Sequence, residues 1–220
     1  MPRQKSYATS TETKNRIMDT CKRLFTEKGY KQTTYSDICE IAKVHPGTIT
    51  YHFGSKKKMA SILYYSIVES IYHYENELFF EEDDLQQLII GNGIHIYLLF
   101  NDPIYCRFSS EFCSEDLSKD DLPNYIRMMS KAFRVTANHI GEKRAKLLFT
   151  AIKGMDTYIE PYIYENMKEL TYEDIFSFIC EMYYPFTELG EIKNRVAKAI
   201  MLLENYEIEF ADFQLVLSQK

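Results

Sequence analysis

Apolar residues recur every three or four positions along most of the chain, the spacing that places them on one face of an α-helix. No stretch between turn signals alternates strictly between apolar and polar residues, as a half-buried strand would. The sequence therefore predicts an all-α fold. Two short helices are expected within residues 33–58, and longer ones over 12–28, 55–80, 85–101, 103–115, 123–140, 142–167, 171–184 and 188–205.

Three features qualify this pattern. Pro161 is expected to kink or break the helix over 142–167, because proline removes a backbone donor. Gly91 and Gly93 lie in a helix that is apolar nearly all round and therefore expected to be central. These glycines either permit close helix packing or leave room for a ligand. Residues 206–217 are apolar but fit neither the helical nor the strand period cleanly.

The two short helices have the signature of a helix-turn-helix. Thr34 and Asp37 have the spacing of a capping box, and Pro46 suits the first position of the second helix. Ile49 and Phe53 then face inward, four residues apart. The outer side keeps small or polar residues, a surface that fits a DNA major groove, namely Gly47, Thr48, Thr50 and Tyr51.

The charge of the 220-residue chain is divided unevenly. Residues 1–70 hold 12 Lys and Arg against 6 Asp and Glu, whereas residues 71–220 hold 14 against 26, for a net charge of −6. A basic head on an acidic body is typical of a DNA-binding module joined to an effector domain.

The domain boundaries follow from the helix pattern and the charge. We expect a flexible basic arm at 1–11, which stays disordered or reaches a minor groove. A three-helix helix-turn-helix domain follows at 12–58, and a larger helical-bundle domain at 59–220. The long helix over 55–80 joins the two domains, because its apolar positions continue across the boundary.

The pattern resembles the DNA-binding domain of the TetR family of repressors over roughly residues 12–70. The chain departs from the family at Lys43, where the turn usually has glycine, and at His45, where the recognition helix usually begins with serine or threonine. The matching positions agree in order and spacing, and they are Ile17, Cys21, Leu24, Phe25, Gly29, Tyr30, Thr33, Thr34, Asp37, Ile38, Ala42, Val44, Gly47, Thr48, Ile49, Tyr51, His52, Phe53, Ser55 and Lys56.

The resemblance implies a set of DNA contacts. Thr34, Tyr51 and Lys56 are expected at backbone phosphates. His52 suits packing as well as a DNA contact. The remaining contacts lie at the start of the recognition helix and approach base edges, and they are His45, Pro46, Gly47, Thr48 and Thr50.

The resemblance also implies that the larger domain binds a small effector and forms a homodimer. Aromatic residues at helical spacing are usually core, but together they can line a pocket. The pocket candidates are Tyr64, Tyr97, Phe100, Tyr105, Phe108, Phe112, Met128, Phe133, Met155 and Tyr158. The dimer interface is expected on the helices over 142–167 and 188–205, at Phe149, Ile152, Met155, Ile200, Leu202 and Leu203.

The function expected from this reading is a DNA-binding transcriptional regulator, usually a repressor, that an effector releases from a palindromic operator. A bound ligand would move the helix over 55–80 and change the spacing of the two heads. One alternative is a redox- or metal-sensing regulator that uses Cys106 and Cys113. Another is a protein on this fold that does not bind DNA.

Other classes of function find little support in the sequence. The five cysteines form no CxxC motif and lie in apolar helical patterns, so we expect reduced core residues and no metal site. No catalytic motif is found, so neither an enzyme nor a cofactor is expected. No apolar run reaches the roughly 18 residues of a membrane span, and the polar N-terminus does not resemble a signal peptide. We therefore expect a cytoplasmic protein without a membrane partner.

Overall fold

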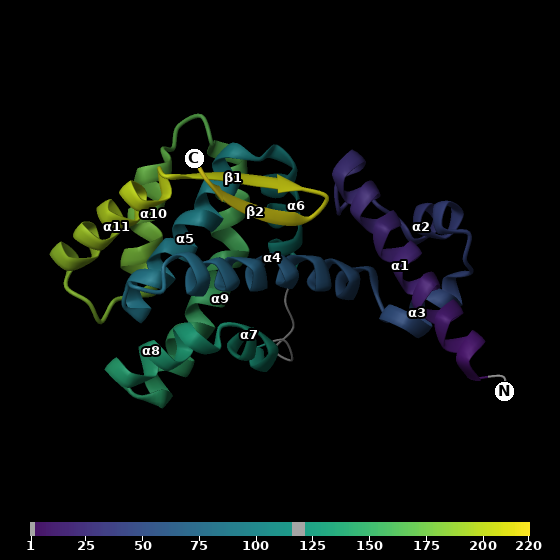
Figure 1. The fold of residues 1–220 in the computed structure, drawn as a ribbon, viewed down its shortest axis with the longest axis horizontal. Helices are drawn as coiled ribbons and strands as arrows, with labels where there is room; N and C mark the ends of the chain where they lie inside the picture. Colours follow the sequence, from purple (N-terminus) through teal and green to yellow (C-terminus); the bar gives the residue numbers. More distant parts are fainter. Residues whose placement is uncertain (1–2, 116–121) are drawn as a thin grey trace. The chain divides into compact units, whose positions relative to one another are not determined.

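The structure, a computed structural model, describes residues 3–115 and 122–220. The chain forms two compact units, Met1–Tyr65 and Ser66–Lys220. The first contains α1 (Arg3–Lys28), α2 (Tyr35–Ala42), α3 (Pro46–Phe53) and the start of α4 (Lys56–Leu78), within which the boundary falls (Figure 1). The prediction of a helical fold is confirmed.

The second unit contains the rest of α4 and all later elements. Its helices are α5 (Asp84–Asn101), α6 (Pro103–Cys113), α7 (Leu122–Met128), α8 (Ser130–Ile140), α9 (Glu142–Asn166), α10 (Tyr172–Tyr183) and α11 (Leu189–Leu203). Two antiparallel strands follow, β1 (Tyr206–Ala211) and β2 (Gln214–Gln219). Among the described residues, no helix combines the length and the apolar character that crossing a membrane requires.

The N-terminal unit is built around the apolar face of α1. Cys21 lies 3.6 Å from Met59 through their sulfur atoms, and Phe25 packs edge-to-face on Tyr30. Arg16 donates to the carbonyl of Ala42, which ties α1 to the end of α2. These contacts fix α2 against α1 and leave α3 to present its outer face.

The start of α1 differs from the prediction. The helix begins at Arg3, so residues 3–11, predicted to be a flexible arm, continue it. No glycine or proline interrupts residues 3–28, so nothing in the sequence stops the helix from extending. The first two residues and the side chains through residue 9, on which a minor-groove contact would depend, lie outside the described residues.

The second unit is organised around α5, as predicted. Twelve residues of α5 are buried, and both of its interior glycines lie at close helix contacts. A Cβ on Gly91 would lie 1.7 Å from the carboxylate of Glu75, and a Cβ on Gly93 would lie 2.8 Å from the ring of Phe176. These glycines therefore serve close packing and do not leave room for a ligand.

Two helix boundaries differ from those predicted. The helix expected over 123–140 divides into α7 and α8 at Met129, whose ψ of 30° leaves the helical range. In contrast, α9 continues through Pro161 to Asn166 instead of breaking. Glu160 and Ile163, on either side of the proline, are buried, so packing holds the last turns in place.

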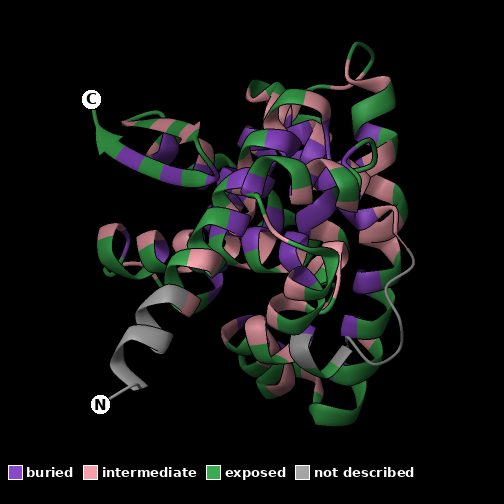
Figure 2. Cartoon of the chain, turned by 90° about the vertical axis from the view of Figure 1, so that its right-hand side faces the viewer, coloured by how far each residue is buried: buried purple, intermediate pink, exposed green. Residues whose placement is uncertain are grey.

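The C-terminal hairpin is the main correction to the all-α prediction. Residues 206–210 do alternate, with half-buried Tyr206, Ile208 and Phe210, and β2 continues the pattern with buried Leu215 and Leu217 (Figure 2). The period was missed because it is interrupted by a turn without glycine. Asp212 and Phe213 form that turn at φ of 49° and 60°, a conformation for which glycine or asparagine is the usual signal.

Candidate nucleic-acid interface and buried cavity

The predicted capping box at the start of α2 is confirmed. The backbone N–H of Asp37 donates to the Thr34 hydroxyl at 3.2 Å, and the backbone N–H of Thr34 donates to the Asp37 carboxylate at 2.7 Å. The same carboxylate pairs with Lys28 near the end of α1. The Lys28 and Thr34 hydrogen bonds hold the pKa of Asp37 well below its usual range, so the carboxylate stays charged.

Lys43 supplies the turn between α2 and α3. Its backbone lies in the left-handed region at φ 53° and ψ 50°, and the N–H of the next residue, Val44, donates to Cys39 O at 3.1 Å. Glycine adopts this conformation with less strain than lysine. The departure from the family pattern thus leaves the turn intact and makes it more strained.

The α3 helix begins at Pro46 and presents a polar outer face. Ile49 is fully buried and anchors the helix, whereas Tyr51 is 84% exposed. His52 and Thr48 are half-buried, and the side chain of His52 packs edge-to-face on Tyr51. The other predicted DNA contacts on this surface are exposed, namely His45, Pro46, Gly47 and Thr50, and so is Thr34 on α2.

Lys56, predicted to contact a phosphate, donates to backbone carbonyls of its own unit. Its ammonium donates to Tyr30 O at 2.8 Å and to Thr33 O at 2.9 Å, and it lies 4.3 Å from the centroid of the Tyr30 ring. Its backbone N–H donates to the hydroxyl of Tyr35. Lys56 therefore ties the start of α4 to the loop between α1 and α2 and to Tyr35 of α2, a position that favours a structural role over the phosphate contact expected from the sequence.

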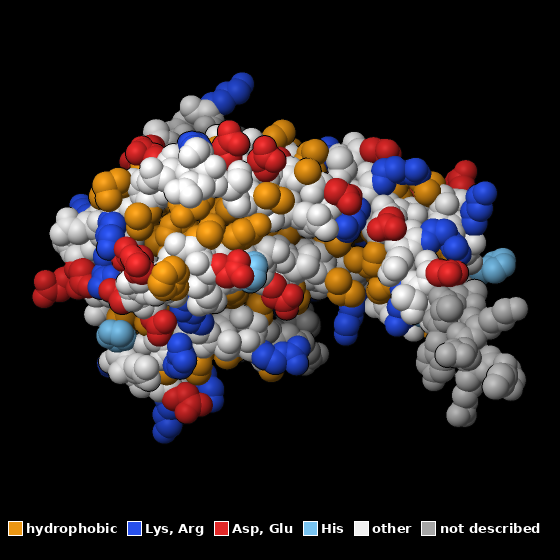
Figure 3. Space-filling view, viewed as in Figure 1, with side chains coloured by type: hydrophobic (Ala, Val, Ile, Leu, Met, Phe, Trp, Pro, Cys, Tyr) orange, Lys and Arg blue, Asp and Glu red, His pale blue; other side chains and the backbone are white. Residues whose placement is uncertain are grey.

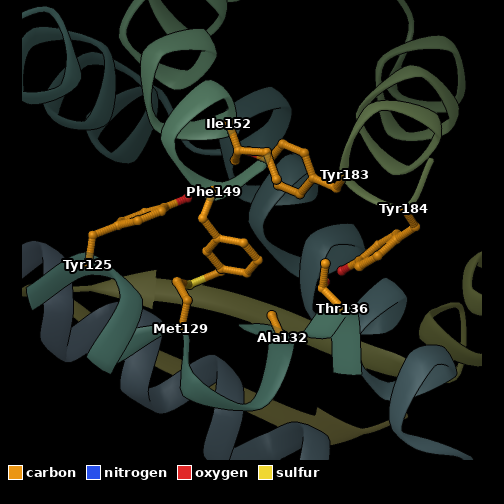
Figure 4. Close-up of a pocket in the computed structure, with 8 residues that line it drawn as sticks. All are labelled: Tyr125, Met129, Ala132, Thr136, Phe149, Ile152, Tyr183 and Tyr184. Atoms are coloured by element: carbon orange, nitrogen blue, oxygen red, sulfur yellow. The ribbon is translucent and has the colours of Figure 1, made fainter. Parts of the chain in front are cut away.

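The C-terminal unit encloses a small cavity among α7, α8, α9 and α10. Tyr125 and Tyr184 approach it from opposite sides with the ring of Phe149 between them (Figure 4). Its free volume of about 10 Å³ is enough for about one water molecule. Its walls also include Met129, Ala132, Thr136, Ile152 and Tyr183.

A polar layer lies beside this cavity. Asp156, which is half-buried, accepts hydrogen bonds from Tyr125 at 3.3 Å and from Tyr183. Withdrawal from water, reinforced by the charge of Glu160, raises the pKa of Asp156 to about 7. Glu160 accepts from Ser109 and lies 3.4 Å from Nε2 of His95.

None of the ten residues predicted for the pocket lines this cavity. Tyr158 is 80% exposed, while Tyr105 and Phe108 pack against the hairpin at Phe210 and Phe213. Phe112 stacks on Phe108. The other six are half-buried elsewhere in the two units, and they are Tyr64, Tyr97, Phe100, Met128, Phe133 and Met155.

Three of the six residues predicted for the dimer interface are buried within their own unit. Phe149 and Ile152 line the cavity, and Leu203 is buried beside Gly93. A side chain buried within its own unit has little area left to bury against a second copy. Met155, Ile200 and Leu202 are half-buried and keep part of their surface accessible.

The cysteines give no support to redox sensing. Cys106 and Cys113 are buried thiols on α6. Burial raises the pKa of Cys106 to about 12, so its reactive thiolate is almost absent at neutral pH. Within residues 3–115 and 122–220, no group of three His, Cys, Asp or Glu side chains is arranged to hold a metal ion.

Comparison with known proteins agrees with the geometry of the N-terminal unit. Residues 17–61 match the family described as "Bacterial regulatory proteins, tetR family". The N-terminal domain belongs to the TetR family. The TetR-type match spans α1 to the start of α4, including the complete helix-turn-helix.

Curated relatives share this TetR-type domain. The "Biofilm operon icaADBC HTH-type negative transcriptional regulator IcaR" of Staphylococcus aureus is 35% identical over 65 residues, which are 30% of this chain and 33% of that protein. The "HTH-type transcriptional regulator TtgR" of Pseudomonas putida is 36% identical over 62 residues, 28% of this chain and 30% of that protein. The chain thus matches about a third of the length of these relatives.

Solved structures extend the similarity of fold beyond the TetR-type domain. RolR without ligand has a TM-score of 0.60 at 14% identity and covers 83% of this chain and 96% of its own. RolR in complex with resorcinol has a TM-score of 0.61 at 14% identity and covers 87% of this chain and 96% of its own. At this identity the similarity concerns the fold alone.

The charged residues beside the cavity, which the sequence analysis missed, had a detectable signal. Lys153, Asp156 and Glu160 share a helical face with Ile152 and Ile163, although charged residues rarely occupy a core face. A charged group at core spacing indicates a buried polar site, and Tyr125, Tyr183 and Tyr184 gather around this one.

Proposed function

We propose that this chain is a TetR-type transcriptional regulator that binds a palindromic operator as a homodimer in the cytoplasm and responds to a small effector. The outer face of α3 carries this proposal. Buried Ile49 anchors the eight-residue helix α3. The exposed residues are His45, just before the helix, and Gly47, Thr50 and Tyr51 on it. Packing within the unit does not require these outer residues, and their size and polarity suit a major groove.

The roles on this surface follow from position. Tyr51 and Thr34 are proposed to contact phosphates, which position the domain without reading sequence. Thr48 and Thr50 approach base edges, where a hydroxyl can bond to any base and a methyl can touch thymine. His45, which caps α3 without a side-chain hydrogen bond, is available for a further contact.

A second copy is needed because helix-turn-helix dimers read two half-sites about 34–36 Å apart. The surface that we propose for dimerisation is a stripe along α9 at helical spacing. Leu147 and Tyr158 on it are 72% and 80% exposed, and the space beside Gly154 is open. Figure 3 shows hydrophobic side chains reaching the surface of the C-terminal unit. The stripe comprises Leu147, Ala151, Gly154, Tyr158 and Tyr162.

Selection from random duplexes tests the DNA-binding role. We expect a palindrome with half-sites about 10–10.5 base pairs apart. Thr48→Ala should change the preference at particular bases. Thr150→Ala, at an exposed position of α9, should leave the selected sequence unchanged. Recovery of unselected sequence, or equal weakening on every duplex by Thr48→Ala, would contradict the reading role of α3.

Sedimentation tests the dimer. Ala151→Glu places a charge in the middle of the stripe and should convert the dimer to a monomer that binds a full operator at least tenfold more weakly. Glu173→Gln, an exposed change on α10 and not on the stripe, is the control. A variant that remains dimeric would place the interface elsewhere.

A further inference from the structure

The cavity in the C-terminal unit combines aromatic walls with a carboxylate just behind them. The hydroxyls of Tyr125 and Tyr183 both donate to Asp156, so each tyrosine joins the cavity to that carboxylate. Asp156 does not itself line the cavity and lies directly behind these two tyrosines. A small donor group that enters the cavity can replace these hydroxyls at the carboxylate.

No ion pair among the described residues joins a cation to the Asp156 carboxylate, although His95 acts on it through its charge. Over the described part of the chain, no lysine, arginine or histidine nitrogen lies within 4 Å of its carboxylate, whereas Glu160 has Nε2 of His95 at 3.4 Å. The neighbouring Glu160 adds a second negative charge one turn along α9. An ionised Asp156 with no cation in contact favours a positive group beside it.

The aromatic wall also suits a cation. Nζ of Lys153 lies 5.0 Å from the centroid of the Tyr125 ring, so an ammonium already faces this ring. Aromatic faces attract cations more strongly when water is excluded, and Phe149 and Tyr184 supply further faces. The cavity thus offers a carboxylate for the charge and rings for an apolar body.

The wall can open to admit a ligand larger than water. Met129 lines the cavity and lies at the break between α7 and α8, where the backbone leaves helical geometry. Methionine is also the side chain most easily repacked. We therefore expect Met129 to be the wall residue that moves when a ligand larger than water enters.

We propose that the effector of this chain is an amine, a protonated nitrogen on a compact apolar or aromatic body, whose ammonium binds Asp156 between Tyr125 and Tyr183. This inference rests on the proposed function, because it names the ligand class of the regulator. Binding of the ammonium favours the ionised carboxylate, so a proton leaves Asp156 on binding at pH values below about 7.

Calorimetry with three matched probes on the full chain tests the proposal. The probes are 2-phenylethylamine, which is protonated at neutral pH, neutral 2-phenylethanol and anionic phenylacetate. We expect the amine to bind at least tenfold more tightly than either analogue. Its affinity should rise from pH 6 to pH 8 as Asp156 ionises. The other titratable groups that act on this carboxylate are Glu160, His95, Tyr125 and Tyr183.

Variants separate Asp156 from these neighbours. Asp156→Asn should lower amine affinity at least tenfold and abolish the rise with pH, while Glu165→Gln should leave both unchanged. Tyr183→Phe, which keeps the carboxylate, should reduce affinity less and preserve the pH dependence. Equal binding of the alcohol, or an unchanged amine affinity in Asp156→Asn, would overturn the proposal.

A DNA arm distinguishes this inference from the proposed function. Amine binding without any operator binding would contradict the regulator and leave the cavity's ligand class standing. Operator binding without preference for the amine would support the regulator and contradict the proposed ligand class. Release of the operator by the amine, and by neither analogue, would support both.

Discussion

Glu75 on α4 and Lys131 on α8 lie side by side in the interior of the C-terminal unit, with Oε2 and Nζ 3.6 Å apart. Glu75 is 2% exposed and fits against Gly91 of α5. One turn earlier on α4, the hydroxyl of Tyr72 lies 3.0 Å from the sulfur of Met129, which lines the cavity. The cavity wall is thus in direct contact with α4, the helix that continues to Lys56 of the N-terminal unit.

Replacing Glu75 with glutamine should stabilise the fold at high pH. Burial raises the pKa of Glu75 from 4.5 to about 8, despite Lys131. A raised carboxyl pKa contributes stability that is complete below about pH 4.5 and is lost as the pH rises to about 8. Glu75→Gln removes this loss, so we expect a gain of roughly 1–3 kcal/mol above pH 8 and little change near pH 5.

Urea unfolding at pH 5 and pH 8.5 checks this prediction. Exposed Glu69, on the same helix, supplies the control variant Glu69→Gln, which should leave the pH dependence intact. Equal effects of Glu75→Gln at both pH values would mean that Glu75 is ionised throughout.

A methyl group at Gly91 should destabilise the C-terminal unit strongly. The added Cβ would lie 1.7 Å from Oε1 of Glu75, a buried carboxylate that would have to shift within the core. We expect Gly91→Ala to cost about 3 kcal/mol or more, through overpacking and a displaced buried carboxylate.

The double variant Gly91→Ala with Glu75→Ala should recover part of that loss, because the shorter side chain vacates the contact. Gly190→Ala on α11 is the control, since a Cβ there meets nothing within 4 Å. It should gain about 0.5–1 kcal/mol from helix propensity. The absence of rescue in the double variant would show that Gly91 is needed for another reason.

Glycine at position 43 should stabilise the helix-turn-helix. Lys43 occupies the left-handed region, where a side chain is strained and glycine is not. We expect Lys43→Gly to raise the free energy of unfolding by about 0.5–1 kcal/mol. Lys14→Gly, at an exposed interior position of α1, removes the same charge and should lower it by a similar amount. Thermal unfolding of both variants should show these opposite changes in stability. A loss of stability in Lys43→Gly would contradict the proposed backbone strain at Lys43.

Alanine at position 56 should act on stability more than on DNA binding. Removing the Lys56 ammonium breaks two hydrogen bonds to backbone carbonyls and the contact with Tyr30, so we expect a loss of roughly 1–2 kcal/mol. The dependence of DNA affinity on salt should keep its slope. Lys58→Ala, at an exposed site, should leave stability unchanged. A slope smaller by about one in Lys56→Ala would establish the phosphate contact instead.

The sequence by itself determined the helix-turn-helix. Its signals are local: Thr34 caps a helix that Asp37 completes, Pro46 begins the next helix, and Ile49 buries one face. Each signal acts over three or four residues, so periodicity and capping suffice to identify it. The charge division and the central position of α5 likewise follow from residue types along the chain, without knowledge of long-range contacts.

Only the tertiary structure decided the cavity, the hairpin and the role of Lys56. Tyr125, Asp156 and Tyr183 meet across three helices, and aromatic periodicity does not distinguish cavity walls from ordinary core. The hairpin depends on strand pairing around a turn without glycine, and Lys56 finds its acceptors 23 and 26 residues earlier in the chain. The physical reason is common to all three: long-range packing selects among partners that are equivalent in local sequence.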